Sequence, residues 1–198
     1  MPTSYIDVLK KNNAVLVHCS SFVSLVGSAQ TNQLGSIEKI CKVITGNYDI
    51  SCSTIVCGDQ PVNNYTGNFG VILAPRTSES ITLASHNDTG STPELRELVR
   101  NSGTVASPLE LHNAIINRVT YNEIYIHTYR VLGLFFTKPI QFGIDTNVIE
   151  LEDKELYSCF PAYDFFQCLN GVFQRVGYDK KHEVFSIVKS CNATNIYG

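Results

Sequence analysis

The sequence predicts a single domain of the α+β class. Short stretches with the pattern of strands and short stretches with the pattern of helices follow one another without regular alternation, which argues against a repeated βαβ architecture. The 198 residues are 43% hydrophobic and 17% charged, so one globular domain can bury its own core. We see no internal repeat or clear linker, and we therefore expect residues 1–198 to fold as one unit.

The first half of the chain is predicted to contain two helices and four strands. Ser4 is a typical helix cap, and the helix after it is expected to end at Asn12 and Asn13. The apolar run that ends at His18 has the pattern of a buried strand, and the next helix is indicated by apolar residues with helical spacing. The helices are expected at 4–11 and 37–44, and the strands at 14–18, 48–56, 69–73 and 81–85.

The second half of the chain is predicted to contain three helices and four strands. Proline in the first helical position follows both Thr92 and Ser107, and Ser107 with Glu110 forms a capping box. A third helix is indicated by apolar side chains that gather on one side of an assumed helix. The helices are expected at 92–99, 107–117 and 161–173, and the strands at 119–126, 131–136, 148–151 and 184–189.

Charge and composition favour a protein that acts inside a cell. The formal net charge of −3 provides no global basic field, so duplex DNA and anionic membranes are not default partners. No apolar run approaches the roughly 20 residues that cross a bilayer, and the N-terminus lacks the pattern of a secretory signal. Seven cysteines without a Cys-x-x-Cys pair argue against a zinc site or a complete disulfide framework, so we expect reduced thiols and a cytoplasmic or intracellular location.

The strand at 119–126 carries a carboxylate among aromatic side chains. Because side chains alternate along a strand, Glu123 shares a face with Tyr121 and Tyr125. A half-buried carboxylate costs free energy unless it has a partner or a task. Two interpretations stay open: an acid with a task inside the sheet, or an acid on an edge strand that faces water.

Three stretches together resemble the catalytic core of one enzyme family. Residues 16–20 place His18 at the exit of the first strand, residues 69–80 join a strand to a Ser-x-Ser, and residues 121–123 read Tyr-Asn-Glu. In this order they are similar to the diphtheria-toxin and poly(ADP-ribose) polymerase branch of the ADP-ribosyltransferases, and residues 131–136 resemble that family's next strand. The resemblance implies a split antiparallel sheet and NAD as the substrate.

The resemblance also implies a role for individual residues. His18 would hydrogen-bond the adenosine ribose of NAD, the backbone of Cys19 and the hydroxyl of Ser80 would hold the nicotinamide carboxamide, and Glu123 would stabilise the cationic sugar. Glu123 and His18 are thus the expected catalytic residues, and they should border one cleft. The remaining positions expected at the NAD site are Ser20, Gly70, Ile72, Ser78 and Tyr121.

The implied activity is mono-ADP-ribosylation of a macromolecule, with a protein acceptor preferred to a nucleic acid and with no metal or membrane partner. A small toxin or a secreted effector acting in a host cell would suit the size. Residues 145–198 have no counterpart in the resemblance, and we expect them to form a C-terminal elaboration that binds the acceptor.

The chain departs from the family pattern at three positions. Cys19 replaces a glycine, and Ile72 and Leu83 replace two tyrosines, one of which stacks on nicotinamide in the family. Aliphatic side chains lose offset stacking worth about 0.5–1.5 kcal/mol per ring pair. Tyr65, Tyr121 or Tyr125 could supply a ring instead, and the alternative is a catalytically inactive binding module of the same fold.

The cysteines and histidines allow a second kind of chemistry. Cys19 or Cys52 could act with a histidine as a Cys-His hydrolase, because such partners meet only in the folded chain. The candidate histidines are His86, His112 and His127. A tyrosine-phosphatase loop is rejected, because Leu25 stands where that loop requires the arginine that holds phosphate.

Overall fold

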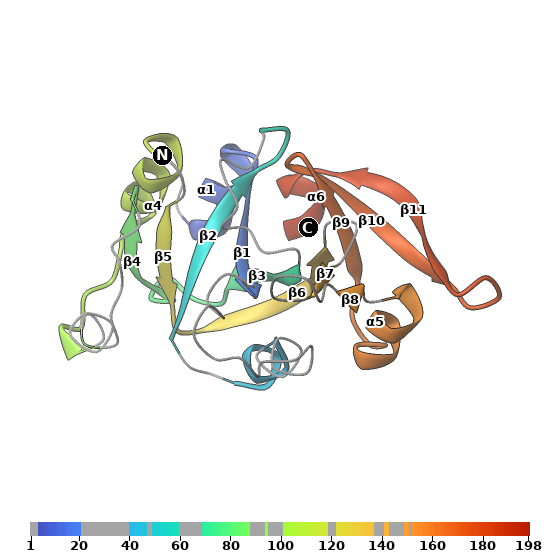
Figure 1. Ribbon diagram of the computed structural model, residues 1–198. Helices are drawn as coiled ribbons and strands as arrows, with labels where there is room; N and C mark the ends of the chain where they lie inside the picture. The colour runs from blue at the N-terminus through green and yellow to red at the C-terminus, as the bar shows by residue number, and fades with distance from the viewer. Residues whose placement is uncertain are drawn as a thin grey trace.

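The computed structural model describes residues 4–20, 40–46, 49–59, 69–87, 94, 101–118, 122–136, 141–142, 149–150 and 152–198. A long, mostly antiparallel sheet runs through the molecule, and short helices pack on it (Figure 1). The α+β class that the sequence predicts is therefore confirmed. The helices are α1 (Tyr5–Lys11), α4 (Pro108–Ile116), α5 (Asp153–Cys159) and α6 (Ala193–Tyr197). The strands of the main sheet are β1 (Ala14–Ser20), β2 (Ile50–Val56), β3 (Phe69–Pro75), β4 (Ile81–Ser85), β5 (Glu123–Ile126), β6 (Tyr129–Phe136), β9 (Phe165–Leu169), β10 (Val172–Asp179) and β11 (Val184–Cys191).

The main sheet has nine strands in the order β11-β10-β9-β6-β3-β1-β2-β5-β4. Every neighbouring pair is antiparallel except β6 and β9, which are parallel. A separate antiparallel pair is formed by β7 (Gln141–Phe142) and β8 (Ile149–Glu150). The sheet order places β5 inside the sheet and leaves β4 and β11 at its edges.

The sheet divides between β1 and β3. These strands pair only where Val17–Ser20 meets Phe69–Ile72, and beyond that stretch they separate. Figure 1 shows β6 crossing below β2 and β5 at a wide angle. The larger cluster of buried apolar side chains includes Leu16, Phe69 and Ile81, and α1 packs against it through Val8 and Leu9.

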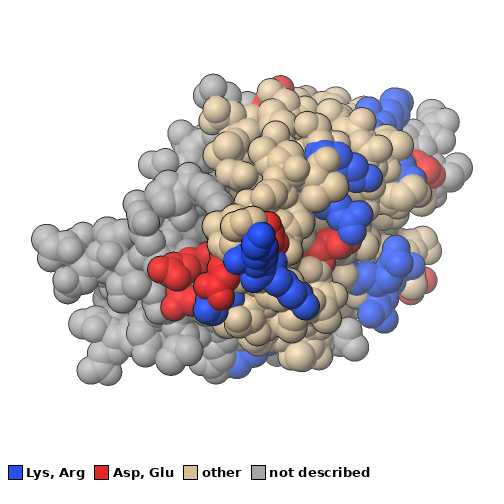
Figure 2. Space-filling view, turned by 90° about the vertical axis from the view of Figure 1, so that its right-hand side faces the viewer, with Lys and Arg blue, Asp and Glu red and all other residues tan. Residues whose placement is uncertain are grey.

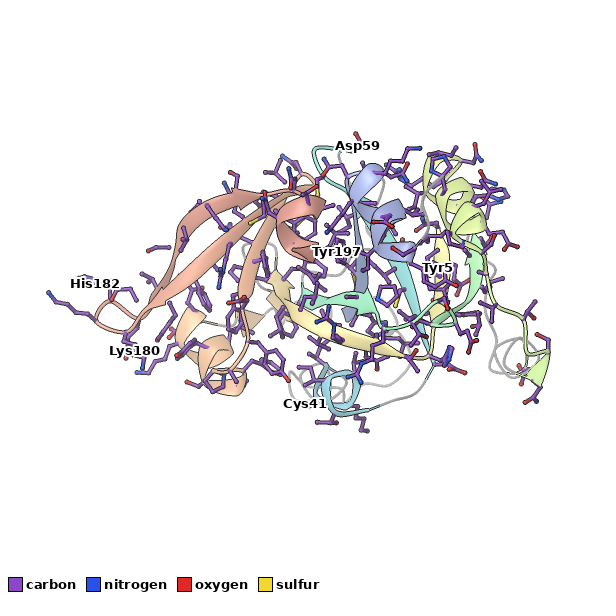
Figure 3. The ribbon with its side chains drawn as sticks, turned by 180° about the vertical axis from the view of Figure 1, so that it is seen from behind. Tyr5, Cys41, Asp59, Lys180, His182 and Tyr197 are labelled. Atoms are coloured by element: carbon purple, nitrogen blue, oxygen red, sulfur yellow. The ribbon has the colours of Figure 1, made fainter. Side chains whose placement is uncertain are left out.

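Tyr197 occupies the point where β1 and β3 separate. A continued ladder would pair Leu16 with Leu73, but the Leu16 amide donates to Tyr197 Oη over 2.8 Å, and that hydroxyl donates to the Leu73 carbonyl over 3.2 Å. Burial raises the pKa of Tyr197 well above its ordinary value. Figure 3 labels this side chain at the end of α6. The hydroxyl thus replaces the ladder contact that the division of the sheet removes.

Most of the predicted elements that fall on described residues are confirmed. The helix after Ser4 begins with the Ser4 side chain accepting a hydrogen bond from the Asp7 amide, and α4 begins with the predicted capping box of Ser107 and Glu110. The described residues 40–45 are helical and overlap the helix predicted at 37–44. The helix predicted at 92–99 lies outside the described residues except for Glu94, which is helical.

The helix predicted at 161–173 is wrong. These residues form β9 and the start of β10, joined by a two-residue turn at Asn170 and Gly171, which have φ values of 49° and 76°. An Asn-Gly pair favours the tight hairpin turn, because both residues tolerate positive φ. Phe165, Phe166 and Cys168 are all buried in the resulting strand. The apolar spacing that resembled a helix therefore belongs to a strand with buried side chains on both faces.

The last part of the chain extends the same sheet. Strand β9 pairs with β6, and β10 and β11 follow it outward to the edge. On β11 the side chains of Ile187 and Val188 are 58% and 65% exposed. Figure 2 views this side of the molecule and shows Lys and Arg interspersed with Asp and Glu on a largely uncharged surface. Residues 152–198 thus add strands to the fold, and the face seen in this view carries charges of both signs.

Candidate active site

Glu123 is buried at the start of an interior strand. Strand β5 lies between β2 and β4, and the Glu123 side chain is 2% exposed. Its Oε1 accepts a hydrogen bond of 2.9 Å from Ser51 Oγ on β2. The edge-strand interpretation is therefore wrong. A carboxylate removed from water in this way needs partners, and the Ser51 hydroxyl is one of them.

Ser51 also contacts His18. Its Nδ1 lies 2.7 Å from the carbonyl oxygen of Ser51. Because a carbonyl can only accept, Nδ1 carries a proton, and in the neutral ring Nε2 is then the acceptor. Ser51 thus binds His18 through its backbone and Glu123 through its hydroxyl, a link that the sequence did not indicate.

The two side chains approach Ser51 from different sides of the strands. Ser51 pairs with Tyr125, and Val17 pairs with Ser53, so strand alternation puts Glu123 and Ser51 on one face. His18 lies in register with Val71 and alternates to the other face, so the strands do not bring His18 and Glu123 to one face, as the expected shared cleft would require. The His18 ring contacts the carbonyl of Ser51 just beyond Val17 and Ser53, the last pair between β1 and β2.

Asn122 fixes the position of its neighbour Glu123. Its side chain is fully buried and makes four hydrogen bonds. Oδ1 accepts from the Thr54 amide over 2.8 Å and from Ser53 Oγ over 3.0 Å, while Nδ2 donates to Thr54 Oγ1 over 2.7 Å and to the Ala114 carbonyl over 3.1 Å. The start of β5 is thereby fastened to β2 and to α4. Sequence reasoning missed this role, although an amide at the start of an apolar strand is a signal for it.

The residues after His18 lie against β3. Cys19 pairs with Gly70, and a Cβ on Gly70 would overlap the carbonyl of His18, so the close approach of the two strands requires glycine. Ile72 is fully buried opposite Val17 and belongs to the smaller apolar cluster. The structure thus places Ile72 in the core instead of on a surface. Ser20 ends β1 and pairs with Phe69.

Ser80 is not brought together with Glu123. The β4–β5 register runs from Ser85 opposite Glu123 to Ile81 opposite Ile126, so Ser80 lies beyond the far end of β5, about 10 Å or more away at roughly 3.3 Å per residue. Its buried Oγ accepts from the amides of Arg76 and Thr77 over 3.0 and 2.8 Å. These contacts give the hydroxyl a role in the turn that leads into β4.

The other predicted positions are spread over the fold. Ser78 is exposed in the turn before β4, and its carbonyl accepts a hydrogen bond of 2.8 Å from the Tyr5 hydroxyl on α1 (Figure 3). Leu83 lies opposite Tyr125, whose ring is 2% exposed. Tyr121 and Tyr65 lie outside the described residues.

Three of the buried or partly buried thiols are poor candidates for a nucleophile. All seven cysteines are free, and burial raises the pKa of Cys52 well above its ordinary value. Burial likewise raises the pKa of Cys57 to about 11 and that of Cys168 to about 12. Since the thiolate is the reactive form, these environments disfavour a Cys-His hydrolase that uses Cys52 as its nucleophile.

Two hollows are lined by described residues. The larger has a volume of about 430 Å³ and lies where the helical segment 40–45, the end of β3 and the start of β6 meet, with Arg76, Tyr129 and Arg130 in its wall. The smaller, of about 180 Å³, lies beside α1 and the turn that holds Ser78. Neither includes His18 or Glu123.

Comparison of the chain with protein-family models, with curated proteins and with solved structures gives no match. A functional assignment therefore depends on the residues themselves. Within the described part of the chain, no group of three or more His, Cys, Asp or Glu side chains is arranged to hold a metal ion. The described helices are also all too short or too polar to cross a membrane.

Proposed function

We propose that the protein transfers ADP-ribose from NAD to a macromolecular acceptor, with Glu123 as the catalytic carboxylate. The observation that carries this proposal is the buried Glu123 side chain, hydrogen-bonded to the residue whose carbonyl holds His18. These are the two residues that the family resemblance assigns to catalysis. We propose a protein acceptor in preference to a nucleic acid.

The chemistry requires a fixed negative charge. The bond between the nicotinamide nitrogen and the ribose carbon breaks with its electron pair leaving on nicotinamide, and positive charge develops on the sugar. An acceptor nucleophile then bonds to that carbon and loses a proton. Glu123, held in place by Ser51 Oγ, would stabilise the cationic sugar without reorganisation during the reaction.

The imidazole would position the dinucleotide. Because the Ser51 carbonyl holds the proton on Nδ1, Nε2 of the neutral His18 ring is suited to accept a hydrogen bond from a ribose hydroxyl. His18 is partly exposed, as such contact requires. In this proposal Ser51 and Asn122 are positioning residues, because they act through His18 and Glu123.

Nicotinamide release from NAD by the purified protein, with and without cell lysate, tests the proposal. We expect release by the wild type and a loss of roughly 100-fold or more in Glu123→Gln, the size of effect seen when one group that stabilises the transition state is removed. Glu79→Gln, which changes an exposed acid in the turn before β4, is the matched control and should retain full activity. If the wild type releases no nicotinamide either with or without lysate, the transferase proposal is refuted. Full activity of Glu123→Gln would refute the role of that residue.

A second candidate is an inactive binding module of the same fold. It is favoured by the burial of Ile72 at the position of the family's stacking tyrosine. This candidate predicts a rise in the melting temperature with NAD, since a ligand that binds the native state stabilises it, without release of nicotinamide. The two measurements on one protein sample therefore distinguish the candidates.

A further inference from the structure

Two guanidinium groups line the larger hollow. Arg76 and Arg130 both line it, and no Asp or Glu is among its lining residues. Within the described part of the chain neither arginine forms an ion pair, whereas Arg118 and Arg175 each pair with an aspartate. Two positive charges in one concave wall without a carboxylate are typical of a site for an anion.

The strand register sets the two arginines side by side. Ala74 pairs with Arg130, and the Arg76 amide donates to the Thr128 carbonyl, so Arg76 and Arg130 are diagonal neighbours across β3 and β6. Diagonal neighbours have Cα atoms about 7–8 Å apart, which lets two long side chains converge on one group. Arg76 Nε donates to the Tyr129 carbonyl over 2.7 Å, and this bond orients the guanidinium while its terminal nitrogens stay available.

The other walls of the hollow suit the same ligand. The helical segment 40–45 ends there, and its terminal carbonyls would repel an anion. The Tyr129 hydroxyl lies 3.0 and 3.1 Å from the carbonyl oxygens of Val43 and Gly46, and donating its proton to either of them reduces that repulsion. Tyr163 adds a ring and a hydroxyl to the wall. The volume of about 430 Å³ falls in the range of small-molecule sites.

We infer that this hollow binds a small phosphate-bearing molecule of nucleotide size, and that Arg76 and Arg130 donate hydrogen bonds to its phosphate. Guanidinium groups form paired, charge-assisted hydrogen bonds with phosphate oxygens. The limited volume of the hollow and the overall charge of −3 favour a small molecule over a nucleic-acid strand. The inference does not rest on the proposed transferase activity, because the hollow contains neither His18 nor Glu123.

Binding of pyrophosphate, AMP and succinate to the full chain, measured by calorimetry at two salt concentrations, tests the inference. We expect pyrophosphate and AMP to bind, with an affinity that falls as salt rises because the arginines are exposed. Arg130→Gln should weaken binding roughly tenfold or more, as expected for the loss of charge-assisted hydrogen bonds. Lys189→Gln removes the same charge from exposed β11 and should bind like the wild type.

Several results would overturn the inference. Wild-type protein that binds neither pyrophosphate nor AMP at millimolar concentration would do so, as would equal losses in Arg130→Gln and Lys189→Gln, which would indicate a general charge effect. Succinate binding as tight as pyrophosphate binding would refute the assignment to phosphate. Arg76→Lys is the second variant, because it keeps the charge but loses the Nε bond, and it should also weaken binding. Glu123→Gln should bind pyrophosphate normally, so failure of the transferase proposal and failure of this one are distinguishable.

Discussion

Replacing Tyr197 by phenylalanine removes one oxygen atom from the point where the sheet divides. The ring stays in place, but the Leu16 amide loses its acceptor and the Leu73 carbonyl loses its donor. Both backbone groups belong to residues that are fully buried, so water does not replace the lost contacts. A buried polar group left unsatisfied costs about 1–3 kcal/mol, and we expect Tyr197→Phe to lower the free energy of unfolding by about 2–4 kcal/mol.

That loss is a large fraction of the about 5–15 kcal/mol that stabilises a typical domain. In a chain of this size it corresponds to a fall in melting temperature of about 4–16 °C. Urea unfolding followed by circular dichroism measures the free energy, and hydrogen exchange should show faster exchange of the Leu16 amide. Tyr178→Phe is the control, because the Tyr178 ring stacks on Tyr157 and its hydroxyl makes no hydrogen bond with described residues. A loss below about 0.5 kcal/mol, the range of ordinary surface substitutions, would refute the role of the hydroxyl.

Three further outcomes are expected. Asn122→Ala should lower the free energy of unfolding by roughly 3 kcal/mol or more, because four buried hydrogen bonds are lost, and denaturation that matches the wild type would contradict this. Ser51→Ala should lower the rate of nicotinamide release more than it changes the KM for NAD, and it should shift the pH profile of that rate, since Glu123 loses a hydrogen bond that favours its ionised form. The pKa of Cys57 and Cys168 is raised from 9.0 to about 11 and about 12, so their contribution to stability is complete below pH 9 and is lost as pH rises toward those values. Urea midpoints at successive alkaline pH values under reducing conditions should fall, and they should fall less in a variant with both thiols replaced by alanine.

Local signals in the sequence predicted local structure. The capping box of Ser107 and Glu110 and the cap at Ser4 mark helix starts that the structure contains. The helix predicted at 161–173 is wrong because the Asn-Gly pair within it favours a tight turn, which overrides the helical spacing of the apolar residues. Asn170 and Gly171 carry the positive φ values that this turn requires.

The candidate site depends on contacts between distant parts of the chain. Glu123 and Asn122 were both visible in the Tyr-Asn-Glu triplet, but their partners on β2 lie about seventy positions earlier, and hydrogen bonds over such separations leave no local pattern. The same holds for Ser80, whose sequence setting resembled a ligand contact and whose hydroxyl instead closes a turn. Side-chain type was readable from sequence, whereas the partner of each side chain was set by the strand order.

The outermost strand bears on how the protein behaves at high concentration. Edge strands expose backbone groups that can pair with a second chain, and proteins guard against this with charged side chains, especially lysine. On β11 only Lys189 has that character, while Ile187 and Val188 stand in solvent beside it. Self-association through this strand is therefore opposed by a single ammonium group, and conditions that screen or neutralise it will favour aggregation.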